Sequence, residues 1–258
     1  MKVREKRITS GKLFEVEFYA VAADGRLYTR GKKKRVSRAV QKKLNDKNAR
    51  KKLRRLIETN FTAEEDYYCT FTYTDEEMPE TYEACKRDLN NFFKRVRRAR
   101  KKAGLPDLKY IYVIERKVSR ETGVPRFHVH LIINGGLKRK EIKKLWGKGD
   151  IKKVEELQEG ANGFEAITKY FYKEWNNELL PDNRKRYTPS RNLKQPKEPP
   201  PKDGVFKMRY LEKLCKQRID DADFWERRYK GRRFIGAEAV YNEDYGTWTL
   251  SVTMRKRE

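Results

Sequence analysis

The sequence predicts an α+β fold in which helices pack on one face of an antiparallel sheet. Segments rich in β-branched and aromatic residues, which are typical of strands, alternate with longer segments whose apolar residues recur at helical spacing. Two of the strand segments are separated only by a short turn, which favours an antiparallel hairpin over a parallel crossover. The expected order in the middle of the chain is β-α-β-β-α-β-α, with N- and C-terminal additions.

Residues 1–62 are expected to form a basic N-terminal accessory region. A half-buried strand is predicted at Leu13–Val21, because apolar and polar residues alternate along it. An Asp-Gly pair then predicts a turn before a short strand at residues 26–29. Residues 32–58 are expected to form a helix whose surface is mostly basic. That surface suits a solvated helix and a helix that follows DNA phosphates equally well.

Residues 63–182 are expected to form the catalytic domain. A helix is predicted at residues 80–102, where an apolar stripe faces away from a strongly basic back. A Gly-Leu-Pro segment at residues 104–106 ends it. The other elements expected in this domain are strands at residues 66–74, 109–117, 126–134 and 151–157, and helices at residues 138–146 and 163–180.

A Pro-rich linker is expected at residues 183–204, because its run of prolines favours an extended, semi-rigid chain. Residues 205–258 follow as a separate C-terminal region. They are expected to contain one basic helix at Phe206–Tyr229 and a hairpin with its turn at Asn242–Gly246.

The charge of the chain indicates a polyanionic partner. Its 258 residues include 64 Lys and Arg against 38 Asp and Glu, a net charge of +26. A nucleic acid relieves the self-repulsion of such a chain and releases condensed counterions. The basic residues are spread along the whole sequence, and no apolar run approaches the roughly 20 residues needed to cross a bilayer. We therefore expect no membrane partner.

The cysteines and the first residues indicate a cytoplasmic protein. The three cysteines, at positions 69, 85 and 215, form no CxxC pair, so we expect reduced and mostly buried thiols. The first residues are charged and lack the apolar segment of a signal peptide. The sequence also has no GxxxxGK[ST] phosphate-binding loop, so any helicase is expected to be a separate protein.

His128 and His130 are the two histidines of the chain, and they point to a metal site. In a strand, residues two apart share a face, so both imidazoles can converge on one ion. Glu115, near the end of the neighbouring predicted strand, is the best candidate for a third ligand. Its alternative role is a solvent-facing carboxylate at the strand end. Nitrogen and oxygen ligands suit Mg²⁺ or Mn²⁺ in phosphoryl chemistry, although ligand type alone also allows Zn²⁺.

Tyr170 and Lys173 form a second candidate group. On a helix they are three residues apart and share a face, whereas Tyr172 is turned away from Tyr170. A phenol is a poor nucleophile at neutral pH, and a nearby ammonium favours the phenolate or holds the phosphate that it attacks. The Tyr-x-x-Lys pattern is common by chance, so its weight depends on the histidine pair.

The combination of three ordered segments resembles the HUH endonuclease superfamily. The segments are CTFTYT (Cys69–Thr74), FHVHLII (Phe127–Ile133) and KYFYK (Lys169–Lys173). The histidines precede the tyrosine, as in the replication-initiator branch of that superfamily. The LWGKG turn (Leu145–Gly149) is also similar to phage and plasmid replication-associated proteins. The resemblance covers roughly residues 66–180, under half of the chain.

This resemblance implies a ferredoxin- or RRM-like core and a definite reaction. His128, His130 and Glu115 would hold a divalent cation, and Tyr170, assisted by Lys173, would attack a phosphate of single-stranded or extruded origin DNA. The products are a 5′-phosphotyrosine and a free 3′-hydroxyl, and the same site can rejoin strands. Rolling-circle replication would then need a host helicase and polymerase. Initiators with two catalytic tyrosines space them on one helix face, so the chain resembles a single-tyrosine enzyme, with Tyr172 as the alternative nucleophile.

Two other interpretations remain open from the sequence. A single-tyrosine transposase has the same motif order, but such enzymes are usually shorter and carry Gln four residues after the tyrosine, where this chain has Glu174. The other is a non-enzymatic, basic nucleic-acid-binding protein with structural histidines.

Substrate contacts are expected from aromatic and basic residues. Tyr67, Tyr68 and Tyr73 suit base stacking, although strand aromatics more often belong to a core. The basic faces within residues 32–55 and 95–102 are expected to follow the DNA backbone.

Overall fold

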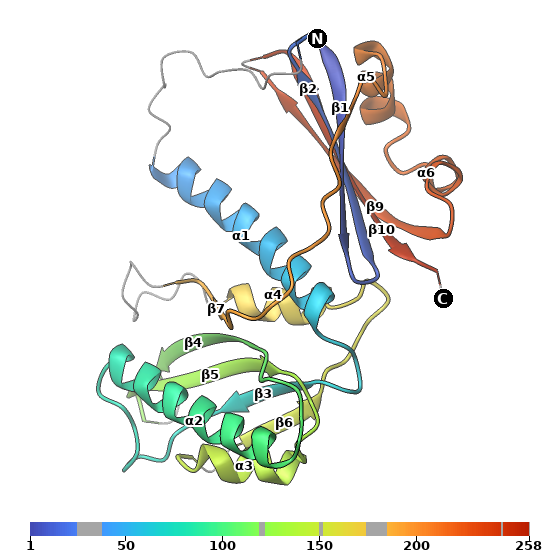
Figure 1. The fold of residues 1–258 in the computed structure, drawn as a ribbon. Coiled ribbons are helices and arrows are strands. Elements are labelled where there is room, and N and C mark those ends of the chain that lie inside the picture. Colours follow the sequence, from blue (N-terminus) through green and yellow to red (C-terminus); the bar gives the residue numbers. More distant parts are fainter. Residues whose placement is uncertain (25–37, 119–121, 150–151, 174–184, 244, 258) are drawn as a thin grey trace. The chain divides into compact units, whose positions relative to one another are not determined.

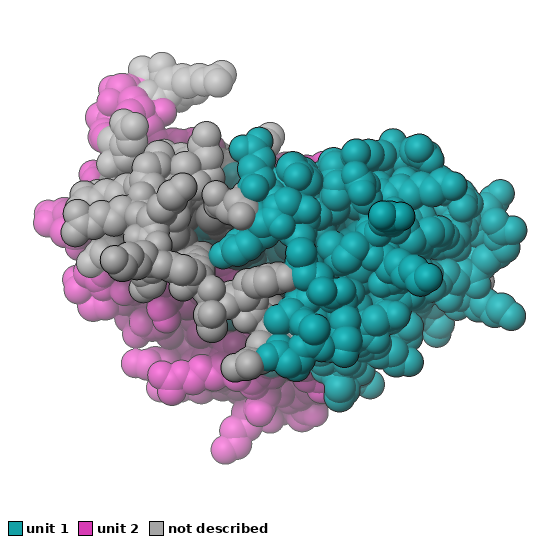
Figure 2. All heavy atoms as spheres, turned by 90° about the horizontal axis from the view of Figure 1, so that it is seen from above, with its two compact units in different colours: residues 1–59, 195–258 teal, residues 60–194 magenta. Residues whose placement is uncertain are grey.

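The computed structural model describes residues 1–24, 38–118, 122–149, 152–173, 185–243 and 245–257, without the side chains of residues 38–44, 152 and 173. It divides into two compact units (Figure 2). Unit 1 contains residues 1–59 and 195–258, and unit 2 contains residues 60–194. Each unit is built around its own antiparallel sheet of five described strands.

The sheet of unit 2 has the strand order β6-β3-β5-β4-β7 (Figure 1). Its central strand, β5, is therefore paired on both sides, with β3 and with β4. The bounds of its strands are β3 (Tyr67–Phe71), β4 (Tyr110–Val118), β5 (Pro125–Ile133), β6 (Lys152–Glu156) and β7 (Thr188–Pro189). The described helices that lie wholly in this unit are α2 (Tyr82–Lys102), α3 (Arg139–Trp146) and α4 (Glu165–Lys173). The α+β class predicted from the sequence is confirmed.

An apolar core joins α2 and α3 to one face of this sheet. In β5 the alternate residues Phe127, Val129 and Leu131 are buried in it. The helices contribute Phe92 and Trp146, which are also fully enclosed. Because successive side chains of a strand point to opposite faces, the histidines of β5 must lie on the other face. The helix α4 contacts that other face, so the described helices are not all on one side as the sequence suggested.

The LWGKG turn fixes the end of α3 against the end of β3. Gly147 ends α3 in the left-handed region, with a φ of 69°. At Gly149 a Cβ atom would lie 2.1 Å from the carbonyl oxygen of Thr72, so only glycine fits there. Trp146 Nε1 donates to that same carbonyl at 2.8 Å. The turn that resembles replication proteins thus has a structural role beside the first motif.

The sheet of unit 1 has the order β8-β1-β2-β10-β9 and combines both ends of the chain. β2 from the N-terminal region pairs with β10 from the C-terminal region, from Leu13–Arg255 to Phe18–Leu250. Residues 1–62 and 205–258, which the sequence analysis treated as separate regions, therefore lie largely in one compact unit. The bounds are β1 (Lys2–Ser10), β2 (Leu13–Val21), β8 (Lys202–Asp203), β9 (Arg232–Asn242), β10 (Thr247–Lys256), α1 (Arg38–Asn60), α5 (Met208–Gln217) and α6 (Ala222–Arg228).

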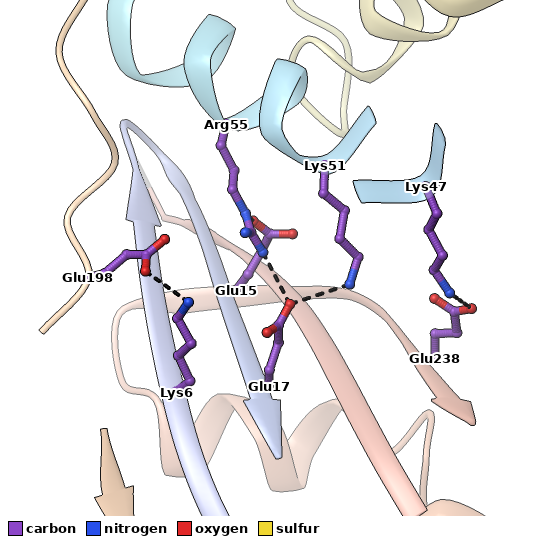
Figure 3. A network of polar contacts seen from close by, with 8 residues as sticks. All are labelled: Lys6, Glu15, Glu17, Lys47, Lys51, Arg55, Glu198 and Glu238. Atoms are coloured by element: carbon purple, nitrogen blue, oxygen red, sulfur yellow. Dashed lines mark hydrogen bonds and ion pairs between the residues drawn. The ribbon is translucent and has the colours of Figure 1, made fainter. Parts of the chain in front are cut away.

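The two faces of this sheet are held by different forces. Val16 and Phe18 of β2 pack in an apolar cluster with Trp225 of α6 and with α5. On the opposite face Glu15 and Glu17 meet α1 through ion pairs (Figure 3). The alternation that predicted strand β2 therefore separates an apolar from a charged interface.

Arg55 is the centre of the charged interface. Its Nε lies 2.6 Å from Glu15 Oε2 and its Nη2 lies 3.3 Å from Glu17 Oε1. Lys51 Nζ adds a contact of 3.4 Å to Glu17, and Lys47 Nζ lies 2.7 Å from Glu238 Oε1 (Figure 3). Much of the described part of α1 that was expected to follow DNA is thus committed to its own sheet.

Several elements differ from the sequence prediction. The single helix predicted at Phe206–Tyr229 is two helices, α5 and α6. The break comes at Asp221, which caps α6 by accepting a hydrogen bond from Phe224 N at 2.9 Å. β1 was not predicted, because basic residues dominate its sequence. The predicted linker also carries regular structure, β7 and β8.

Other predictions agree with the structure or fall outside it. The hairpin turn predicted at Asn242–Gly246 joins β9 to β10. The three cysteines are free and buried, and burial raises the pKa of the Cys85 thiol to about 12. The strand predicted at residues 26–29 and the end of the helix predicted at residues 163–180 lie outside the described residues. Among the described helices, none is long and apolar enough to cross a bilayer.

The buried ion pair of unit 1 allows a stability test. Arg255 Nη1 lies 3.0 Å from Glu58 Oε2, and their side chains are 8% and 1% exposed. Arg255→Ala leaves the buried Glu58 carboxylate without this partner, so we expect the free energy of unfolding to fall by about 3–5 kcal/mol in a urea titration of the full chain. The exposed Lys47–Glu238 pair is the matched control, and Lys47→Ala should cost less than about 1 kcal/mol. Equal effects of the two substitutions would contradict this assignment.

Candidate active site

Strand β5 places both histidines on the sheet face opposite α2. Phe127, Val129 and Leu131 occupy the apolar core, so His128 and His130 are directed to the other face. His128 is half-buried, whereas His130 is only 2% exposed. In the adjacent strand β3, Cys69 and Phe71 belong to the same core, so the alternation directs Tyr68 and Thr70 to the histidine face.

The imidazole of His130 has a polar partner at each ring nitrogen. Its Nε2 lies 2.7 Å from Glu115 Oε2, and its Nδ1 lies 3.0 Å from the hydroxyl oxygen of Tyr68. With a neutral imidazole, Nε2–H donates to the carboxylate and the Tyr68 hydroxyl donates to Nδ1. Burial raises the pKa of the Tyr68 phenol, so this hydroxyl keeps its proton at neutral pH. The orientation of His130 is therefore fixed from both sides.

Glu115 is positioned by the pairing of β4 with β5. In that register Glu115 lies directly opposite His128, and its carboxylate also reaches His130. Its side chain is 2% exposed, so the alternative of a solvent-facing carboxylate at the strand end is wrong. Lys117 Nζ forms an ion pair with the other oxygen, Glu115 Oε1. A buried carboxylate thus lies between an ammonium and an imidazole.

Tyr170 of α4 lies over this group of side chains. The centroid of its ring is 5.0 Å from that of His130, with an angle of 80° between the ring planes. Its ring also meets Tyr68 edge-on at 6.0 Å. The neighbouring Phe171 is fully buried beside Tyr68 and anchors the helix there. Tyr170 itself is 40% exposed, so the phenol is held at the site and remains accessible.

The structure brings together most of the site residues predicted from the sequence. Glu115, His130 and Tyr170 form one group, with His128 in register beside Glu115. Lys173 is the last residue of α4, and its side chain lies outside the described part of the chain. Tyr172, the alternative nucleophile, is half-buried, whereas Tyr170 is exposed.

Tyr68 was not assigned to the site from the sequence, which left it between base stacking and core packing. Its ring lies parallel to that of His130, at 4° and a centroid distance of 6.3 Å. Tyr73, from the same segment, is a core residue whose hydroxyl donates to Cys85 Sγ at 3.3 Å. The position of Tyr68 one residue before Cys69, on a strand next to the histidines, was the available signal.

Two of the basic residues expected to follow DNA have structural partners instead. Arg100 is 3% exposed and donates to the carbonyl oxygens of Pro106, Asn134 and Gly135. Arg95 donates to the carbonyl oxygens at the end of α3. Both belong to α2, on the face opposite the histidines. They hold loops in place, so they are not available to a strand bound at the histidine face.

The donor atoms on this face are of the types that a divalent cation binds, although they make a hydrogen-bonded group here. Within the described ranges, no three His, Cys, Asp or Glu side chains are arranged as a metal site. The facing Nε2 of His130 and Oε2 of Glu115 are nevertheless a nitrogen and an oxygen donor on one face, with His128 beside them. The metal site thus stays a prediction to which this donor set fits.

Comparison with known proteins gives one match. Residues 66–175 match the family model for replication-associated proteins of the ORF2 type. The matched segment is less than half of the chain, and it contains all of the proposed site residues, from Glu115 to Lys173. No curated protein and no solved structure gives a significant match. The chain is therefore similar to replication-associated proteins over its second unit, which supports a role in the initiation of replication.

The contact between Tyr68 and His130 can be tested without any ligand. Tyr68→Phe keeps the aromatic ring and removes the hydroxyl from Nδ1, so we expect a loss of stability of about 1 kcal/mol in urea. We also expect the Nδ1 resonance of His130 to move in ¹⁵N–¹H spectra, which contain only two histidine side chains. Tyr67→Phe, on the other face of β3, is the control and should leave that resonance in place. An unchanged resonance in Tyr68→Phe would exclude the contact.

Proposed function

We propose that this chain is a site-specific, single-strand DNA endonuclease and ligase that nicks a replication origin to start rolling-circle replication. The observation that carries the proposal is the position of Tyr170, an accessible phenol held 5.0 Å from the buried His130 ring. The match of residues 66–175 to replication-associated proteins supports the same conclusion. The order of the histidine and tyrosine motifs supports the HUH type of chemistry.

The proposed cofactor is Mg²⁺ or Mn²⁺, held by His128, His130 and Glu115. When bound, such a cation polarises the scissile phosphate and offsets the charge that develops on it. The contact between His130 Nε2 and Glu115 Oε2 marks where the two donors face each other. In the loaded site Nε2 offers its lone pair, and the proton at Nδ1 is donated to the hydroxyl oxygen of Tyr68. Tyr68 therefore serves His130 in either tautomer.

Tyr170 is the proposed nucleophile. Its phenolic oxygen forms a bond to phosphorus as the bond from phosphorus to the 3′ oxygen breaks. The phenol gives up its proton and the departing 3′ oxygen gains one, which leaves a 5′-phosphotyrosine and a free 3′-hydroxyl. One phosphate ester replaces another, so the reverse reaction with a 3′-hydroxyl rejoins the strand. Lys173, one helical turn from Tyr170, is proposed to stabilise the phosphate charge.

The proposed substrate is single-stranded or extruded origin DNA. A phenol fixed over a sheet cannot readily reach a phosphate within a stacked duplex, because the strand must enter the site. The free 3′-hydroxyl is a primer for a polymerase, so a host polymerase and helicase are the proposed partners. A single-tyrosine transposase would share the reaction, whereas a non-enzymatic DNA-binding protein would form no covalent product.

Covalent trapping on DNA tests the nucleophile. We expect the full chain, incubated with an origin-like single strand and Mn²⁺, to form a protein–DNA adduct that survives SDS. Tyr170→Phe removes the attacking oxygen and should abolish the adduct, and EDTA should do the same. Tyr172→Phe is the matched control and should retain it. An adduct in Tyr170→Phe that disappears in Tyr172→Phe would reassign the nucleophile, and DNA binding without an adduct under any metal would favour the non-enzymatic alternative.

Metal binding tests the ligand set independently of cleavage. Glu115→Gln keeps the size of the side chain and removes its charge, so we expect the affinity for Mn²⁺ measured by calorimetry to fall at least about tenfold. Glu155→Gln, an exposed change on β6, is the control and should leave the affinity unchanged. Equal affinities for Mn²⁺ in both variants would remove Glu115 from the ligand set while leaving the assignment of Tyr170 intact.

A further inference from the structure

Unit 1 contains a basic hollow that the proposed nuclease site does not use. It has a volume of about 470 Å³ and lies where α6 ends and β9 begins. The hollow is lined by Asp223, Glu226, Arg227, Lys230, Gly231, Arg232 and Arg257. Four of these residues are cations and two are acids, and the volume is in the range of sites that bind small ligands.

One of the two acids is already engaged within the protein. Glu226 accepts a hydrogen bond from Phe234 N at 2.8 Å and forms an ion pair with Arg257. The Phe234 hydrogen bond and the Arg257 charge lower the pKa of the Glu226 carboxyl, so it stays ionised and bound to these partners. The remaining lining charges are Asp223 against three cations, Arg227, Lys230 and Arg232. The hollow therefore carries a positive excess.

Arg232 is held in a fixed position within this excess. Its guanidinium carbon lies 3.7 Å from the centre of the Phe14 ring, and its side chain is half-buried. Burial, together with the positive charge of Arg7, lowers the pKa of the Arg232 guanidinium. A cation in such a place is under-compensated, and a bound anion would offset the cost of its desolvation.

The backbone at the hollow leaves space for a ligand. Gly231 has a φ of 74°, and a Cβ atom placed on it would meet no other atom within 4 Å. A planar guanidinium matches the oxygens of a phosphate group, and a flexible ammonium adds charge from a second side. Arg232 and Lys230 supply this combination on the two sides of Gly231.

We propose that this hollow binds a phosphate group, either of a nucleic-acid strand or of a free nucleotide. It is a second phosphate site, formed entirely by residues of unit 1 and independent of Tyr170 and the histidines. In a replication protein it would bind the strand at a position other than the scissile phosphate.

The test removes the two exposed cations of the hollow, Arg227 and Lys230, in the double variant R227A/K230A. Binding of a fluorescein-labelled oligo-dT strand to the full chain is measured by anisotropy over a range of salt concentrations. Each phosphate contact on a single strand contributes about 0.7 to the slope of log affinity against log salt. We therefore expect weaker binding and, for two lost contacts, a slope that is smaller by about 1.4 in R227A/K230A.

The matched control is R209A/K213A, which removes two exposed cations of α5 outside the hollow. It makes the same change in net charge, and we expect the wild-type slope. Competition by dTMP and by inorganic phosphate separates the two sources of the phosphate. Displacement of the strand by dTMP in the wild type, lost in R227A/K230A, identifies a free nucleotide, whereas a strand that resists dTMP identifies the polynucleotide. Equal slopes for both double variants would overturn the proposal.

The outcome is distinguishable from the test of the nuclease. R227A/K230A should still form the covalent adduct at saturating DNA, because Tyr170 is untouched. Tyr170→Phe should in turn keep the wild-type salt slope. Loss of the adduct with an intact slope therefore concerns only the proposed nuclease, and the reverse concerns only the hollow.

Discussion

The alternation of side chains along β5 is the constraint on which the candidate site depends. Phe127, Val129 and Leu131 are enclosed by α2 and α3, and this burial directs His128 and His130 to the opposite face. A shift of one residue in the register would expose the three apolar side chains and bury both imidazoles in the core. The apolar packing on one side of the sheet thus specifies the polar chemistry on the other.

The same register brings in the carboxylate, and its burial is unfavourable unless it is compensated. Glu115 is almost fully enclosed, and an isolated charge there would be strongly destabilising. The imidazole of His130 and the ammonium of Lys117 provide the compensation. Because a buried pair costs more to break than it contributes to folding, such a group is better explained by function than by stability. A divalent cation would satisfy the same carboxylate.

The parts of the structure that depend on neighbouring residues could be predicted from the sequence. The alternation in β5 and the apolar stripe of α2 are local signals, and they indicated the strand, the helix and the shared face of the histidines. The pairing of β2 with β10 joins residues more than 200 positions apart, and no local pattern encodes it. The role of Tyr68 depends likewise on which strand lies beside β5. The break before α6 was visible as a capping Asp221, but the basic helical pattern obscured it.

The net charge of +26 defines the class of partner, and only the structure shows which cations can meet it. Arg55 is bound to Glu15 and Glu17 in the sheet of unit 1, and Arg100 is enclosed by carbonyl oxygens in unit 2. Such residues hold the fold together and have little charge to offer DNA. Arg232 differs, because its guanidinium rests on an aromatic ring beside other cations. Counting charges therefore overstates the DNA-binding surface of this chain, and the cations that matter are those whose compensation the protein itself does not supply.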